Sequence, residues 1–150
     1  MKPMISALAL SLAALAGPAL ADDHIEEIEA QGSVSEVADR LVAAVEGAGA
    51  TVFARVDHAG GAASVQMELA PMELVIFGNP QLGTPAMQDD VRAGLVLPLR
   101  VLVYDDNGRT TILYEEADDL FDDLAIDDDA AYVGQMAEAL RMLTAAAAGE

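Results

Sequence analysis

The sequence predicts an α+β domain of two layers, in which helices cover one face of a mainly antiparallel sheet. Three observations lead to this prediction. Short apolar runs rich in β-branched residues recur along the chain, with turn residues between them. Apolar residues at helical spacing follow the first run and also end the chain. Asn107-Gly108 separates two of the runs as a two-residue hairpin turn would, which makes those strands antiparallel neighbours.

The first 21 residues have the form of a secretory signal peptide. Lys2 supplies positive charge, an Ala- and Leu-rich run follows, and Ala19-Leu20-Ala21 matches a small-x-small cleavage site. The apolar run is short for a bilayer span, although an uncleaved anchor is the alternative. We therefore predict a periplasmic or secreted protein that is cleaved after Ala21 and leaves the membrane. Residues 22–150 then form a single domain.

The composition excludes several classes of function. The formal net charge is -19, from 26 acidic and 7 basic residues, and nucleic-acid binding needs cations that face phosphates. The absence of cysteine rules out disulfides, thiol catalysis and iron–sulfur clusters. The acidic balance suits solubility, or else the attraction of cations and basic partners.

The domain is predicted to begin with a strand and a helix. Ile25 to Ala30 reads as an edge strand, whose acidic residues discourage pairing with other chains. Ser33 and Glu36 have the spacing of a capping box. Apolar residues then recur at helical spacing from Val34 to Val45, and Gly47 and Gly49 end the helix.

Two further strands follow, Thr51 to Val56 and Met72 to Phe77, both apolar and rich in β-branched or aromatic residues. The segment between them contains small residues and glycine. Residues 59–65 would form either a short helix capped by Asp57 or a loop.

The next segment combines turn residues with two more strands. Thr84-Pro85 has the pattern of a helix start and predicts a short helix. Leu95 to Tyr104 reads as the fourth strand, in which Pro98 requires an edge, a bulge or the start of the ladder. The hairpin at Asn107-Gly108 leads to the fifth strand, Thr110 to Tyr114.

The chain is predicted to end in helices. From Ala117 the pattern is that of a helix with an acidic face and an apolar side that includes Phe121 and Leu124. Asp127 to Asp129 suit the N-terminus of the last helix, where negative charge meets the helix dipole. We expect the alanine-rich end, Ala145 to Ala148, to fray.

Four motifs together resemble the domain-of-unknown-function 302 (DUF302) family. They are Asp57-His58, FGNP at Phe77 to Pro80, LGTPAMQ at Leu82 to Gln88, and GLVLPLRVLVY at Gly94 to Tyr104. The resemblance covers about Ile28 to Asp118 in order and spacing. It implies a strand-helix-four strands-helix order, like one half of the TATA-binding protein, but no DNA binding and no settled activity.

The candidate ligand site lies between the Asp57-His58 end of the second strand and the loop that carries Asn79, Thr84 and Met87. His58 would serve as an acid/base group or a ligand, and the loop would hold a small anion or polar molecule at a helix N-terminus. The alternative is structural: Asp57 and His58 cap the following segment, and glycine, asparagine and proline satisfy the turn.

Metal binding has less support in the sequence. Met67, Met72 and Met87 would join His58 around copper(I), yet methionine more often fills gaps in a core. For calcium, residues 127–129 lack the required glycine, and residues 105–108 belong to a hairpin. We assign no metal ligand, leave the cofactor open, and expect weak, nonspecific attraction of cations.

Three functions remain open. The first is a periplasmic ligand-binding or accessory domain without catalysis, in which His58→Ala abolishes binding of a small molecule. The second is a small hydrolase or isomerase with Asp57-His58 as acid/base, although the sequence contains no nucleophile, zinc or phosphate-loop motif. The third is a structural module that forms a homodimer through the free face of its sheet.

Overall fold

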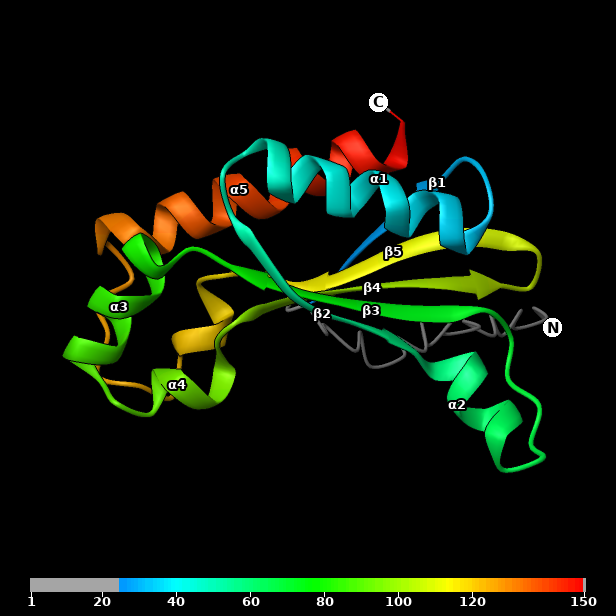
Figure 1. The fold of residues 1–150 in the computed structure, drawn as a ribbon. Helices are drawn as coiled ribbons and strands as arrows, with labels where there is room; N and C mark the ends of the chain where they lie inside the picture. Colours follow the sequence, from blue (N-terminus) through cyan, green and yellow to red (C-terminus); the bar gives the residue numbers. More distant parts are fainter. Residues whose placement is uncertain (1–24, 150) are drawn as a thin grey trace, which may run out of the picture.

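The computed structural model describes residues 25–149, so the predicted signal peptide and its cleavage site lie outside the described residues. The described chain has two layers, with a five-stranded sheet beneath two long helices (Figure 1). The strands are β1 (Ile25–Ala30), β2 (Thr51–Asp57), β3 (Met72–Gly78), β4 (Leu99–Asp106) and β5 (Arg109–Glu115). The helices are α1 (Val34–Gly47), α2 (His58–Ser64), α3 (Pro80–Asp89), α4 (Ala93–Val96), the 3-10 turn η1 (Asp119–Phe121) and α5 (Ala131–Ala148).

The sheet has the order β1-β5-β4-β3-β2, and all neighbouring strands are antiparallel. This arrangement confirms the predicted α+β class, and it places β1 at an edge as its acidic residues indicated. The β4–β5 hairpin is also confirmed. Asn107 and Gly108 have φ values of 54° and 90°, which a two-residue turn between twisted strands requires.

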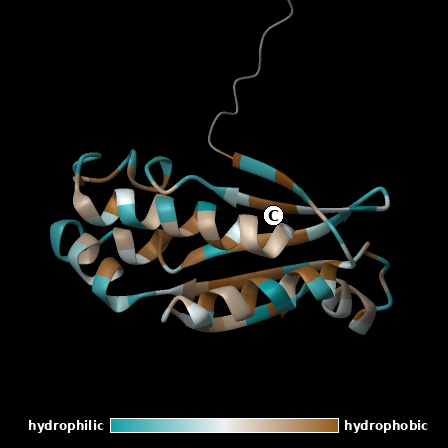
Figure 2. Cartoon of the chain, turned by 90° about the horizontal axis from the view of Figure 1, so that it is seen from above, coloured by the Kyte–Doolittle hydropathy of each residue, from teal (hydrophilic) through white to brown (hydrophobic). Residues whose placement is uncertain are grey.

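The core lies between the sheet and the pair α1 and α5, which run side by side across one face (Figure 2). On α1 the predicted stripe Val37, Leu41 and Val45 is fully buried. The capping box is present, because the Ser33 backbone N–H donates to Glu36 Oε2 over 2.8 Å. None of the described helices is both long enough and apolar enough to cross a membrane.

The helix predicted to begin at Thr84 begins at Pro80 instead. Asn79 is its N-cap, and the Asn79 Oδ1 atom accepts a hydrogen bond from Gln81 N over 2.9 Å. Pro80 takes the first helical position, where its missing N–H has no cost. Pro85 therefore lies inside the helix rather than at its start.

The fourth strand was predicted to begin at Leu95, but pairing begins at Leu99, which lies opposite Phe77. Residues 93–96 form the short helix α4 instead. Proline has no amide hydrogen for the ladder, so the strand starts directly after Pro98, one of the three positions the sequence allowed.

The C-terminal predictions need two corrections. The acidic segment after Ala117 forms only the 3-10 turn η1, because neighbouring aspartates repel one another and favour turns over helix. The last helix starts at Ala131, after the aspartates, and its end is anchored rather than frayed. Arg40 Nε donates to the Ala147 carbonyl over 2.8 Å, and the Ala147 and Ala148 side chains are buried.

Candidate functional site

The structure separates the predicted site into two parts. In the antiparallel β2–β3 pair, Asp57 lies opposite Glu73 and Thr51 lies opposite Gly78. Asp57 and His58 are therefore at one end of this pair, and Asn79 is at the other end, about 20 Å away at strand spacing. The prediction that one ligand contacts both His58 and the Asn79–Met87 segment is wrong for this reason.

Asp57 and His58 belong to the start of α2. The Asp57 Oδ1 atom accepts a hydrogen bond from Gly60 N over 2.8 Å, which confirms the predicted cap and the helical alternative for this segment. A Cβ atom at Gly60 would lie 2.4 Å from Asp57 Oδ2, so glycine makes room for the capping carboxylate. His58 is half-buried and forms no hydrogen bond with the described residues.

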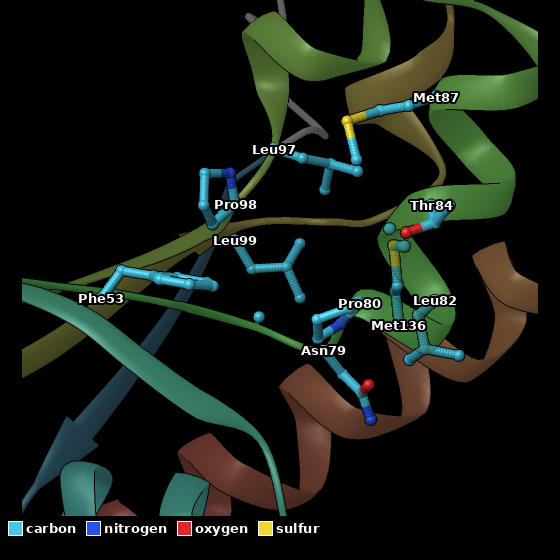
Figure 3. Close-up of a pocket in the computed structure, with 12 residues that line it drawn as sticks. Phe53, Asn79, Pro80, Leu82, Thr84, Met87, Leu97, Pro98, Leu99 and Met136 are labelled. Carbon is cyan, nitrogen blue, oxygen red and sulfur yellow. The ribbon is translucent and has the colours of Figure 1, made fainter.

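Asn79, Thr84 and Met87 are brought together around a pocket of about 250 Å³. The pocket lies where the ends of β3 and β4 meet α3 and α5, and mostly apolar side chains line it (Figure 3). Phe53 and Pro98 lie on one side of it, with Met87 and Leu82 on the other. The remaining apolar walls come from Leu97, Leu99 and Met136.

A β-bulge places Phe53 at this pocket. Val52 lies opposite Phe77 and Ala54 lies opposite Ile76, which leaves Phe53 as the extra residue on β2. Its side chain is 56% exposed and reaches across the end of β3. A Cβ atom at Gly78 would lie 3.4 Å from Phe53 Cε2 and 3.6 Å from Pro98 Cβ. Glycine at position 78 thus allows the phenyl ring to approach the backbone.

Two other glycines leave space beside the pocket. A Cβ atom at Gly83 would lie 3.7 Å from Leu97 Cδ1 and 3.9 Å from Met87 Cε. A Cβ atom at Gly94 would lie 3.6 Å from Met87 Sδ. Gly83 lines the pocket, so a larger side chain there would occupy volume that a ligand needs, whereas one at Gly94 would press on Met87.

The polar groups of the pocket do not form the expected anion site. Pro80 has no N–H, Gln81 N donates to the Asn79 side chain, and the amides of Leu82 and Gly83 both donate to the Asn79 carbonyl over 3.0 Å. The first turn of α3 therefore has no free amide to offer an anion. The Thr84 hydroxyl forms no hydrogen bond with the described residues, and no charged residue lines the pocket.

Ionic and hydrogen-bonded contacts join the C-terminal end of α3 to α5 and to the segment before α5. The Asp90 carboxylate accepts from Arg92 Nε over 3.0 Å and from the Ala125 amide over 2.9 Å. The Arg92 guanidinium, followed by the backbone amides, holds the pKa of Asp90 well below its usual range. The Tyr132 hydroxyl donates to Asp89 Oδ2 over 2.7 Å. Burial, aided by Asp89, raises the pKa of Tyr132 to about 12.

The structure does not bring all three methionines considered for copper to His58. Met87 lies at the pocket, at the far end of the sheet from His58. Met72 lies at the His58 end, because its neighbour Glu73 pairs with Asp57. Met67 is 67% exposed. Within the described part of the chain, the acidic groups of Glu116, Asp118 and Asp119 lie within 4.8 Å of one another. Exposed acidic groups often cluster in this way without a metal.

Comparison with known proteins identifies the family of this chain. The model of the domain of unknown function DUF302 matches residues 26–148. The chain belongs to the DUF302 family. Its fold resembles the crystal structure of an uncharacterized conserved DUF302 protein from Bacillus stearothermophilus, with a TM-score of 0.68 and 20% identity. That comparison covers 84% of this chain and 96% of the other, and at this identity it establishes the DUF302 fold alone.

Curated relatives match part of this DUF302 protein. It is 45% identical over 85 residues to the fluoride-specific ion channel FluC 1 of Brucella suis. The matched stretch covers 57% of this chain and 34% of that relative. The match to FluC 1 of Brucella abortus has the same identity and covers 32% of that protein. The chain thus spans about a third of the length of these relatives.

Proposed function

We propose that this DUF302 protein binds a small, uncharged and mainly apolar molecule in the pocket between Phe53 and Met87, and that it acts without catalysis. The pocket itself supports the proposal most directly: its walls are mainly apolar, and Thr84 and Asn79 are the polar residues among those that line it. A few polar groups in an apolar cavity orient a ligand, while burial of apolar surface supplies the affinity.

The size of the pocket limits the ligand. Its volume of about 250 Å³ is slightly below the range of about 300–1,000 Å³ that is usual for small-molecule sites. A single aromatic ring system or a short branched chain would fill it. Charged ligands are disfavoured, because the lining contains no charged side chain and the whole chain carries a net charge of -19.

The first test measures binding of indole, a neutral aromatic probe, by saturation-transfer NMR. Gly83→Leu fills the space beside Leu97 and Met87, so we expect at least a tenfold loss of affinity. Gly134→Leu is the matched control, because Gly134 also lies in a helix and a Cβ atom there meets nothing within 4 Å. Equal affinity in both variants, or no saturable binding in the wild type, would contradict the pocket proposal.

His58→Ala distinguishes this proposal from catalysis by Asp57 and His58. Because His58 lies at the other end of the β2–β3 pair, we expect this variant to bind indole as the wild type does. A hydrolase or isomerase would instead show turnover that His58→Ala abolishes. Native mass spectrometry of protein isolated without added ligand then identifies the natural occupant, which Gly83→Leu should lose and Gly134→Leu should keep.

We also propose that the protein is exported and that its mature chain begins at Asp22. The charged, apolar and small-residue segments of residues 1–21 support this proposal. The intact mass of the protein from its own cells measures it directly. A mass that includes residues 1–21 in a membrane fraction would support the anchor alternative instead.

The curated relatives favour a second candidate, an accessory domain that works with an ion channel, because a stretch of 85 residues is shared with proteins named fluoride-specific channels. The pocket offers fluoride no cation and no free first-turn amide, so this role would depend on contact with a partner rather than on capture of the ion. Titration of the protein into sodium fluoride, followed by fluorine NMR, tests this. Saturable broadening of the fluoride signal would mean that the domain itself holds the ion.

A further inference from the structure

The face of the sheet opposite α1 and α5, here called the open face, carries a continuous apolar row. Leu113, Leu102, Leu74 and Val56 lie side by side on β5, β4, β3 and β2 in the observed register. They alternate along their strands with residues such as Val75, Val101 and Val103, which are fully buried beneath the helices. The long helices α1 and α5 lie on the opposite face (Figure 1), and Val96 of α4 and Leu120 of η1 border the row.

The next row of the open face contains Arg100, which forms no hydrogen bond or ion pair with the described residues. Arg100 lies opposite Ile76 on β3, and Glu115 lies opposite Ile25 on β1. Val101 pairs with Tyr114 in the antiparallel β4–β5 ladder. Arg100 precedes Val101 and Glu115 follows Tyr114, so Arg100 and Glu115 are neighbours across β4 and β5. Both are exposed, and no hydrogen bond or ion pair joins them.

Arg100 differs from the other arginines of the described chain. Arg40, Arg55, Arg92, Arg109 and Arg141 each donate to a carbonyl or a carboxylate. In a protein with 26 acidic residues, a guanidinium that pairs with none of the described carboxylates is conspicuous on an apolar face. Arg109 lies on the same face, but it contacts Asp106 and Glu29 of its own chain.

We propose that the open face binds a second copy of this chain, with a twofold axis that runs along the strands between β4 and β5. Such an axis places β4 of one copy over β5 of the other copy. Each residue of β4 then faces, in the other copy, the residue with which it pairs across β4 and β5 in its own chain. Leu102 then packs on Leu113 of the other copy. Arg100 meets Glu115 of the other copy twice, once on each side of the axis, and so offsets part of the repulsion between two acidic chains.

The size of the face predicts a weak dimer. Five strands spaced about 4.8 Å apart and about 20 Å long give the sheet face a flat area of roughly 500 Å². The uneven surface of the side chains adds to this area. Stable interfaces commonly bury about 800 Å² on each partner. We therefore expect a dissociation constant in the micromolar range, and tighter association at high salt as like charges are screened.

The test uses sedimentation velocity of the purified chain between about 1 and 200 µM, a range that brackets a micromolar constant. R100E and E115R each create like-charged contacts across the axis. The dissociation constant of the dimer should therefore rise at least tenfold in each variant alone. An equimolar mixture of the two variants should restore it, because every like-charged contact becomes an opposite-charged one in the mixed pair. An interaction within one chain cannot produce this rescue.

Two further measurements complete the test. Leu102→Glu should abolish the dimer while the circular dichroism spectrum stays that of the wild type, because Leu102 lies on the open face rather than in the core. A monomer at every concentration, or variants that dimerise as the wild type does, would overturn the proposal. Failure of the mixture to restore a dimer lost in both single variants would overturn the placement of the axis. Loss of indole binding is not expected in any of these variants, so the result is independent of the pocket proposal.

Discussion

At the scale of single residues, Asp90 has the clearest structural task. It is 9% exposed, and its carboxylate accepts from Arg92 and from the amide of Ala125, which joins the C-terminal end of α3 to the segment before α5. A carboxylate that receives this many hydrogen bonds is stabilised in its charged form. Its contribution to folding should therefore depend on pH.

Asp90→Asn should lower the melting temperature at pH 7. Because the folded pKa lies below the unfolded value of about 3.9, the charged Asp90 stabilises the fold fully above that pH and loses its effect as the pH falls further. The difference from the wild type should thus shrink below about pH 4. Scanning calorimetry at pH 7 and pH 3 measures this difference. Asp128→Asn, an exposed control, should show no such change.

At the scale of elements, the start of α3 depends on Asn79, which closes one end of the pocket as well as capping the helix. Asn79→Ala should cost about 1 kcal/mol of unfolding free energy, since it removes the acceptor for Gln81 N. Asn79→Asp should stay within a few tenths of a kcal/mol of the wild type, because aspartate caps as well as asparagine. Urea unfolding measures both values. Equal losses of unfolding free energy in the two variants would mean that the carboxamide nitrogen of Asn79, rather than its capping oxygen, stabilises the fold.

At the scale of the whole molecule, the net charge of -19 determines the response to salt. Raising sodium chloride from about 0.01 M to about 1 M shortens the screening length from about 30 Å to about 3 Å. Self-repulsion then weakens, and we expect the melting temperature to rise by about 5 °C. The control is magnesium chloride at matched ionic strength. A further rise specific to the divalent ion would mean that a site such as Glu116, Asp118 and Asp119 binds it.

The sequence by itself determined the order of the elements and most of their ends, because the signals are local. Helical spacing located α1, the Ser33 capping box marked its start, and Asn107-Gly108 marked the hairpin. The errors came where two local signals competed: Thr84-Pro85 resembled a helix start as closely as Asn79-Pro80, and the apolar run from Leu95 concealed α4.

Only the tertiary structure decided where the candidate site lies. The sequence identified Asn79, Thr84 and Met87, but it placed His58 beside them, because nothing local shows which end of β2 meets which end of β3. The bulge that aims Phe53 into the pocket, and the row of leucines on the open face, likewise depend on pairing between strands far apart in the chain. Register is a property of the assembled sheet, and it sets which side chains share a pocket or a face.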